Sequence, residues 1–109
     1  PMSVTAKAEG RIAQLTVAPG VAGAPNEVHL IVVDDVGEPA LDAADGSVVL
    51  SSETVERLPV ELELTEAGHW VGSVVIPQPG PWQVTGRFRL GDFDDTAVQG
   101  ILVVAPPGG

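Results

Sequence analysis

Two histidines and a set of loop carboxylates are the side chains of this sequence whose types suit chemistry. The histidines are His29 and His69, and 15 Asp and Glu residues outnumber 5 Lys and Arg residues. Carboxylate oxygens are the ligands of hard cations such as Ca²⁺, and an imidazole beside them suits a transition metal. Whether these side chains meet depends on the elements that carry them.

No motif of an enzyme is visible. The chain has no cysteine, no Ser, His and Asp arrangement on a nucleophile elbow, no glycine-rich phosphate loop after a strand and no His-x-x-x-His pair. The lack of cysteine also excludes disulfides, iron–sulfur clusters and Cys-type zinc sites. Two loop carboxylates acting as acid and base would need a cleft, so a hydrolase is the least favoured alternative. We expect a non-enzymatic role.

The net charge of the chain limits the classes of partner that it can bind. Its 109 residues carry a formal net charge of −10, which opposes binding to polyanions. We therefore expect neither nucleic-acid binding nor direct lipid binding. The aromatic residues are two Trp and two Phe, with no Tyr, which is too few for both a core and a stacking platform for bases or sugars.

Apolar residues alternate with polar ones in short runs between Gly, Pro, Asn and Asp clusters, which predicts β-strands throughout. The predicted strands are 12–18, 27–34, 47–52, 58–64, 69–76, 82–90 and 96–104. Residues 3–9 are either an added edge strand or a continuation of the first strand with Gly10 as a bulge. This pattern predicts one domain over 1–109: an antiparallel immunoglobulin-like β-sandwich of seven or eight strands, with Trp70 and Trp82 inward and 105–109 as a tail.

Antiparallel strands place alternate loops at the same end of a sandwich. The loops after the second, fourth and sixth predicted strands carry nine carboxylates: Asp34, Asp35, Glu38, Asp42, Asp45, Glu66, Asp92, Asp94 and Asp95. Arg89 is the basic residue expected near them, and His69 is expected at their rim. The candidate metal ligands are therefore His69, Asp34, Asp35, Asp92, Asp94 and Asp95. A solvated acidic rim is the competing interpretation, because Asp is a common turn former.

The two histidines are expected to lie apart. His29 is near the start of the second predicted strand and His69 at the start of the fifth, which would be opposite ends of a sandwich. At about 3.3 Å per residue, this predicts a separation of roughly 15–20 Å. Such a separation would prevent both from binding one ion.

Two stretches carry a resemblance to a known family. The first comprises Leu15-Thr16-Val17-Ala18-Pro19-Gly20, Gly23, Pro25-Asn26-Glu27-Val28-His29-Leu30, Asp34, Gly37 and Pro39. The second comprises Gly68-His69-Trp70, Val75-Ile76-Pro77, Pro79-Gly80-Pro81-Trp82, Arg87 and Phe93-Asp94. Together they resemble the extracytoplasmic C-terminal domain of bacterial copper transport proteins of the CopD type, often fused to a CopC domain. They are more loosely similar to YtkA- and FixH-type domains.

The resemblance implies a setting for the domain. The chain would be excised from a larger membrane protein, would lie outside the cytoplasmic membrane and would serve copper uptake or tolerance. Its partner would be its own membrane domain or a copper-donor protein, with copper as the candidate metal. The resemblance supplies no ligand set, so His69 is chosen on geometry. The alternative is a structural or interaction immunoglobulin-like module of a bacterial surface protein.

Overall fold

The computed structural model describes residues 1–92 and 94–108. Strands occupy most of this chain. They are β1 (Met2–Ala8), β2 (Arg11–Ala18), β3 (Pro25–Val33), β4 (Ala43–Ser51), β5 (Leu58–Glu66), β6 (His69–Val75), β7 (Gly80–Leu90) and β8 (Asp94–Val104). The all-β antiparallel prediction is confirmed, with eight strands. Phe93, in the predicted last turn, lies outside the described residues.

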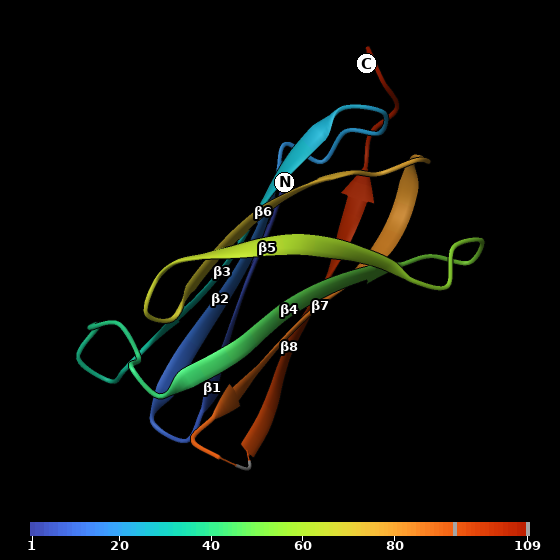
Figure 1. The fold of residues 1–109 in the computed structure, drawn as a ribbon. Helices are drawn as coiled ribbons and strands as arrows, with labels where there is room; N and C mark the ends of the chain where they lie inside the picture. Colours follow the sequence, from blue (N-terminus) through green and yellow to red (C-terminus); the bar gives the residue numbers. More distant parts are fainter. Residues whose placement is uncertain (93, 109) are drawn as a thin grey trace.

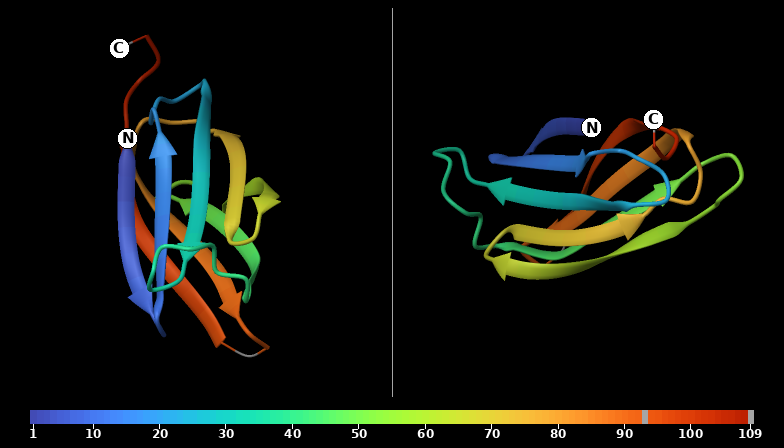
Figure 2. Two further views of the ribbon diagram at one scale, coloured as in Figure 1. Left: turned by 90° about the vertical axis from the view of Figure 1, so that its left-hand side faces the viewer. Right: turned by 90° about the horizontal axis from the view of Figure 1, so that it is seen from above.

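All eight strands form one antiparallel sheet in the order β1-β2-β3-β6-β5-β4-β7-β8. The sheet curls until it is nearly barrel-like (Figures 1 and 2). Strand β5 makes the bend, because its first residues pair with β4 and its later residues pair with β6. At the open side β1 packs on β8 so closely that a Cβ on Gly100 would lie 2.6 Å from Val4 Cγ1.

The inward faces of the strands form one apolar core. Trp82, Phe88, Leu15, Leu30 and Leu50 are its largest fully buried side chains. Burial of such side chains contributes about 1.5–3 kcal/mol each, which is the main favourable term for the fold. The period-two alternation of the sequence produces this core, because successive side chains of a strand point to opposite faces.

Several predicted facings are confirmed. Trp70 and Trp82 are 6% and 1% exposed, as predicted, and alternation along 69–76 also places Val74 and Ile76 on the face of Trp70, where both are buried. Alternation along 58–64 predicts that Leu64 faces inward with Leu58, Val60 and Leu62, but Leu64 is 58% exposed. The physical reason is the irregular pairing between Leu64 and Glu66, where β5 loses its register with β6 at the end of the strand.

Strand boundaries also differ from prediction in two places. Residues Met2–Ala8 form a separate edge strand that pairs with β2, so Gly10 is part of a turn and not a bulge in one long strand. Strand β4 begins at Ala43, four residues before its predicted start, and contains a register shift between Ala44 and Ser47.

The loop between β2 and β3 is held by a buried side chain. Asn26 is fully buried, and its Oδ1 accepts hydrogen bonds from the backbone N–H groups of Gly20 (2.7 Å) and Val21 (3.0 Å). Its Nδ2 donates to the carbonyls of Val21 and Ala24. The same loop binds the chain after β8, since Ala105 N donates to Gly20 O at 2.8 Å. Among the described residues, no helix is long and apolar enough to span a membrane.

Candidate metal centre

His29 and His69 come together on the outer face of the sheet. His29 is the fifth of nine residues in β3 and lies opposite Val71 of β6, whereas His69 lies opposite Ile31. The two histidines are therefore diagonal neighbours on adjacent antiparallel strands. Leu30 and Trp70, which alternate with them along the two strands, are buried on the other face. Alternation thus turns both imidazoles outward.

The two rings face each other through one nitrogen each. His29 Nδ1 lies 3.1 Å from His69 Nε2, and the ring centroids are 5.3 Å apart with a tilt of 36°. Their side chains are 28% and 24% exposed. The pair is therefore accessible from solvent but held within the side-chain layer of the sheet.

Each histidine has a carboxylate at its other nitrogen. His29 Nε2 lies 2.5 Å from Glu27 Oε1, a hydrogen bond in which the ring N–H donates. His69 Nδ1 lies 3.6 Å from Glu66 Oε1, the distance of a loose ion pair. The Glu27 carboxylate favours a proton on His29 Nε2, so the neutral His29 ring presents its bare Nδ1 to His69.

At 3.1 Å the two facing nitrogens are at hydrogen-bond distance, and the contact is satisfied when His69 Nε2 carries the proton and donates it to His29 Nδ1. A metal ion bound to both nitrogens would take the place of that proton. A metal-bound histidine usually donates its second ring N–H to a carboxylate, which fixes the ring and raises its basicity. Glu27 and Glu66 are placed for this role. The donor set of two imidazoles suits copper, zinc or nickel.

An acidic groove lies beside the histidine pair. Its volume is about 740 Å³, it is widely open to solvent, and Glu27 and Val71 are among its lining residues. Glu61 and Glu63 of β5 also line it. Strands β3, β5 and β6 contain no Lys or Arg. The electrostatic potential here therefore attracts cations toward the histidines.

The predicted separation of the histidines is wrong. The expectation of roughly 15–20 Å treated His29 as near a strand end and left the neighbours of each strand open. Strand β3 begins at Pro25, so His29 is central, and β3 pairs directly with β6. The two histidines are thus two residues apart along the ladder.

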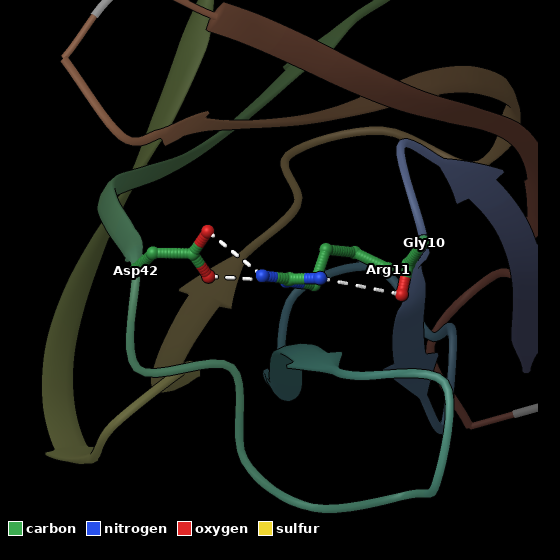
Figure 3. A network of polar contacts seen from close by, with 3 residues as sticks. All are labelled: Gly10, Arg11 and Asp42. Carbon is green, nitrogen blue, oxygen red and sulfur yellow. Dashed lines mark hydrogen bonds and ion pairs between the residues drawn. The ribbon is translucent and has the colours of Figure 1, made fainter.

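The acidic loops do gather at one end, as predicted. Val32 N donates to Gly68 O at 2.7 Å, which joins the β5–β6 turn to β3, and Gly91 N donates to Asp42 O at 3.1 Å, which joins the β7–β8 turn to the loop after β3. Yet Arg89 is not the only basic residue there, contrary to prediction. Arg11 binds Asp42 through two hydrogen bonds of 3.0 and 2.9 Å (Figure 3).

Three carboxylates of the predicted acidic end have other roles, and one of them is the candidate ligand Asp34. Arg89 pairs with Asp45 at 2.5 Å, and Asp34 Oδ1 accepts backbone hydrogen bonds from Val36 and Glu38 at 3.0 and 2.9 Å. Asp34 thereby closes the turn after β3, and Arg11 lowers the pKa of Asp42 through their hydrogen bond.

The other predicted ligands stay exposed and apart from His69. Asp35, Asp92, Asp94 and Asp95 are all exposed. In the part of the chain that the structure describes, no three His, Asp or Glu side chains are grouped to hold one ion. The predicted set of His69 with these aspartates is therefore not assembled as one group.

His29, Glu27 and Glu66 were not among the predicted site residues. The local signal was present, since Glu27 and His29 are two residues apart and so share one face of a strand. Their meeting with His69 depends on the pairing of β3 with β6, which periodicity alone does not specify.

Comparison with known proteins identifies the fold alone. No protein-family model and no curated protein matches the chain. A solved DUF4426 family protein from Pseudomonas aeruginosa PAO1 is similar in structure, with a TM-score of 0.73, 15% identity and 95% of each chain covered. A DUF4785 family protein from Legionella pneumophila gives a TM-score of 0.68 with 9% identity. It covers 90% of this chain, which spans only 29% of that protein's length.

Proposed function

We propose that this chain is a non-enzymatic metal-binding domain that serves a copper transport or resistance membrane protein outside the cytoplasmic membrane. The observation that carries the metal-binding part is the facing pair of ring nitrogens, His29 Nδ1 and His69 Nε2, 3.1 Å apart. Copper and the membrane setting rest on the resemblance to CopD-type domains. Copper is here a cargo that the domain holds and passes on.

The arrangement of charge supports a transfer role. The open groove beside the pair carries Glu27, Glu61 and Glu63, and its strands contain no Lys or Arg. A cation arriving from a donor protein, or leaving for the membrane domain of the parent protein, would be attracted along this face. Two protein ligands leave the other coordination positions of an ion free for a donor or acceptor.

Metal titration of the 109-residue chain tests the proposal. Isothermal titration with copper(II) sulfate should give one site per chain that His29→Ala and His69→Ala each abolish or weaken at least about tenfold. Asp35→Asn, at the acidic end, is the matched control and should bind as the wild type does. Wild-type affinity in both histidine variants, or no binding at all, would refute the proposal.

An interaction module of a surface protein is the second candidate function. For this candidate function we also propose that the curled sheet is an immunoglobulin-like sandwich, in which β5 connects the two layers along one side by pairing with both β4 and β6. The observation that favours this candidate is an exposed apolar patch on β7 and β8, where Val103 (72% exposed) lies opposite Pro81, next to Ile101 (62% exposed). Sequencing the parent gene separates the two functions. Membrane helices upstream favour the first, and tandem β-domains favour the second.

A further inference from the structure

The distance between the two facing nitrogens restricts the geometry of any ion between them. With metal–nitrogen bonds of about 2.0–2.1 Å, two nitrogens 3.1 Å apart subtend an angle of about 95–100° at the metal. This angle lies between those of square-planar and tetrahedral centres. A linear two-coordinate ion would need nitrogens about 4 Å apart at the same bond length.

The sheet holds this spacing. The histidines stand on a continuous β3–β6 ladder that runs from Pro25 and Val75 to Ile31 and His69. Buried Trp70 fixes the backbone beneath His69, and the hydrogen bond to Glu27 fixes the ring of His29. Opening the pair by about 1 Å would require a ring to turn away from its partner, and a turn of the His29 ring would strain its hydrogen bond to Glu27. The angle at the metal is therefore set before an ion arrives.

Soft ligands are missing from the face that carries the pair. The chain has no cysteine and a single methionine. Met2 is 7% exposed and belongs to the core, where its Sδ lies near Gly100 of β8. Thiolate and thioether sulfur favour Cu(I), whereas imidazole nitrogen with oxygen ligands in tetragonal geometry favours Cu(II). The usual affinity order of divalent ions also places Cu(II) above Zn(II).

We infer that the His29–His69 pair selects a divalent ion bound at two adjacent positions, Cu(II) ahead of Zn(II), and does not bind Cu(I) as a linear bis-imidazole ion. This inference rests on the proposed metal-binding function and specifies its substrate. Water or a ligand of the partner fills the remaining positions. Glu27 is a positioning residue that orients the His29 ring and does not itself bind the ion.

Parallel titrations in the two oxidation states test the inference. The chain is titrated with Cu(II), Zn(II) and, under nitrogen with ascorbate, Cu(I), each against a chromophoric chelator. The His29→Ala/His69→Ala double variant is the control, because it keeps the Pro1 amine and every exposed carboxylate. We expect it to lose Cu(II) affinity at least about tenfold and to leave Cu(I) affinity unchanged. Wild-type Zn(II) binding should be weaker than Cu(II) binding.

One spectroscopic measurement and one comparison of variants test the geometry of the bound ion and the role of Glu27. Electron paramagnetic resonance of the Cu(II) form should show a tetragonal centre with two nitrogen ligands in the wild type only. Glu27→Gln should weaken Cu(II) binding by about 10- to 100-fold, while the control Glu53→Gln, outside the groove, leaves it within about twofold.

The possible failures are distinct. Histidine-dependent Cu(I) binding with a linear geometry by X-ray absorption, or Zn(II) bound more tightly than Cu(II), would overturn the oxidation-state inference and leave the proposed metal function standing. Metal binding that is independent of both histidines in every titration would overturn the proposed function itself.

Discussion

The indole of Trp70 lies directly on the backbone of Gly46. A Cβ built on Gly46 would lie 2.3 Å from Trp70 Cδ2 and 2.4 Å from Cε2. Gly46 sits within the register shift of β4, next to Asp45 at a positive φ of 55°. The irregular start of β4 therefore makes room for the largest side chain of β6, the strand that carries His69.

Gly46→Ala should destabilise the protein. The added methyl group cannot fit against the indole, and overpacking of this kind costs about 1–3 kcal/mol of the free energy of unfolding. Urea unfolding followed by tryptophan fluorescence measures the loss. The cost should shrink in a Trp70→Ala background, since the cavity there accepts the methyl group. An equal cost in both backgrounds would contradict the contact.

Asn26→Ala should also destabilise the protein, for a different reason. The side chain binds two backbone N–H groups and at least two carbonyls of the β2–β3 loop, and each buried group left without a partner costs about 1–3 kcal/mol. We expect a loss of at least about 2 kcal/mol in urea unfolding. Hydrogen exchange should show faster opening at Gly20 and Val21. Unchanged exchange at these two amides would show that the Asn26 side chain does not hold the β2–β3 loop.

Local features of this fold were open to prediction from the sequence. Strict alternation predicts that Trp82 and Phe88 share a face, because side-chain direction along a strand depends only on neighbouring residues. Leu64 is the exception, since the register of β5 against β6 shifts between Leu64 and Glu66 and the Leu64 side chain is exposed there.

The candidate metal centre depends on contacts that are far apart in the sequence. His29 and His69 are 40 residues apart and meet because β6 pairs with β3 on one side, while β5, its neighbour in the chain, pairs with it on the other. A period-two pattern identifies the outward face of each strand but not its neighbour. The gathering of acidic loops was predictable because it needs only the antiparallel direction of the strands.

Asp42→Asn should remove a pH-dependent contribution to stability. The Arg11 guanidinium donates hydrogen bonds to Asp42 and lowers its pKa below the ordinary value of 3.8. The ion pair therefore stabilises the protein fully above about pH 4, and this contribution is lost as the pH falls through the lowered pKa. At pH 7 the variant should lose about 0.2–1 kcal/mol, the usual value for an exposed pair.

The pH range of the loss is the decisive measurement for this ion pair. Urea midpoints of the wild type and Asp42→Asn should differ at pH 7 and converge as the pH falls below the ordinary aspartate value of 3.8 and through the lowered pKa of Asp42. Glu53→Gln, at the other end of the sheet, is the matched control and should follow the wild type. A difference that persists unchanged at the lowest pH would contradict the ion-pair account.

Glu9→Gln should stabilise the protein at neutral pH, the opposite sign to Asp42→Asn. Glu9 is in the β1–β2 turn, and the carboxylate of Asp94 at the start of β8 raises the pKa of Glu9 above 4.5 by repulsion and by a hydrogen bond to the protonated form. The folded protein thus holds the Glu9 proton more tightly than the unfolded chain. Stability from this pair is complete below about pH 4.5 and is lost as the pH rises through the raised pKa.

Melting temperatures between pH 4 and pH 7 test this sign. The wild type should gain stability from this pair as the pH falls through the range, whereas Glu9→Gln lacks the repulsion and should show a flatter profile with a higher melting temperature at pH 7. Asp94→Asn should reproduce the effect, because it removes the other carboxylate, while Glu53→Gln should not. Parallel profiles for the wild type and Glu9→Gln would show that the β1–β2 turn and the start of β8 do not interact through these carboxylates.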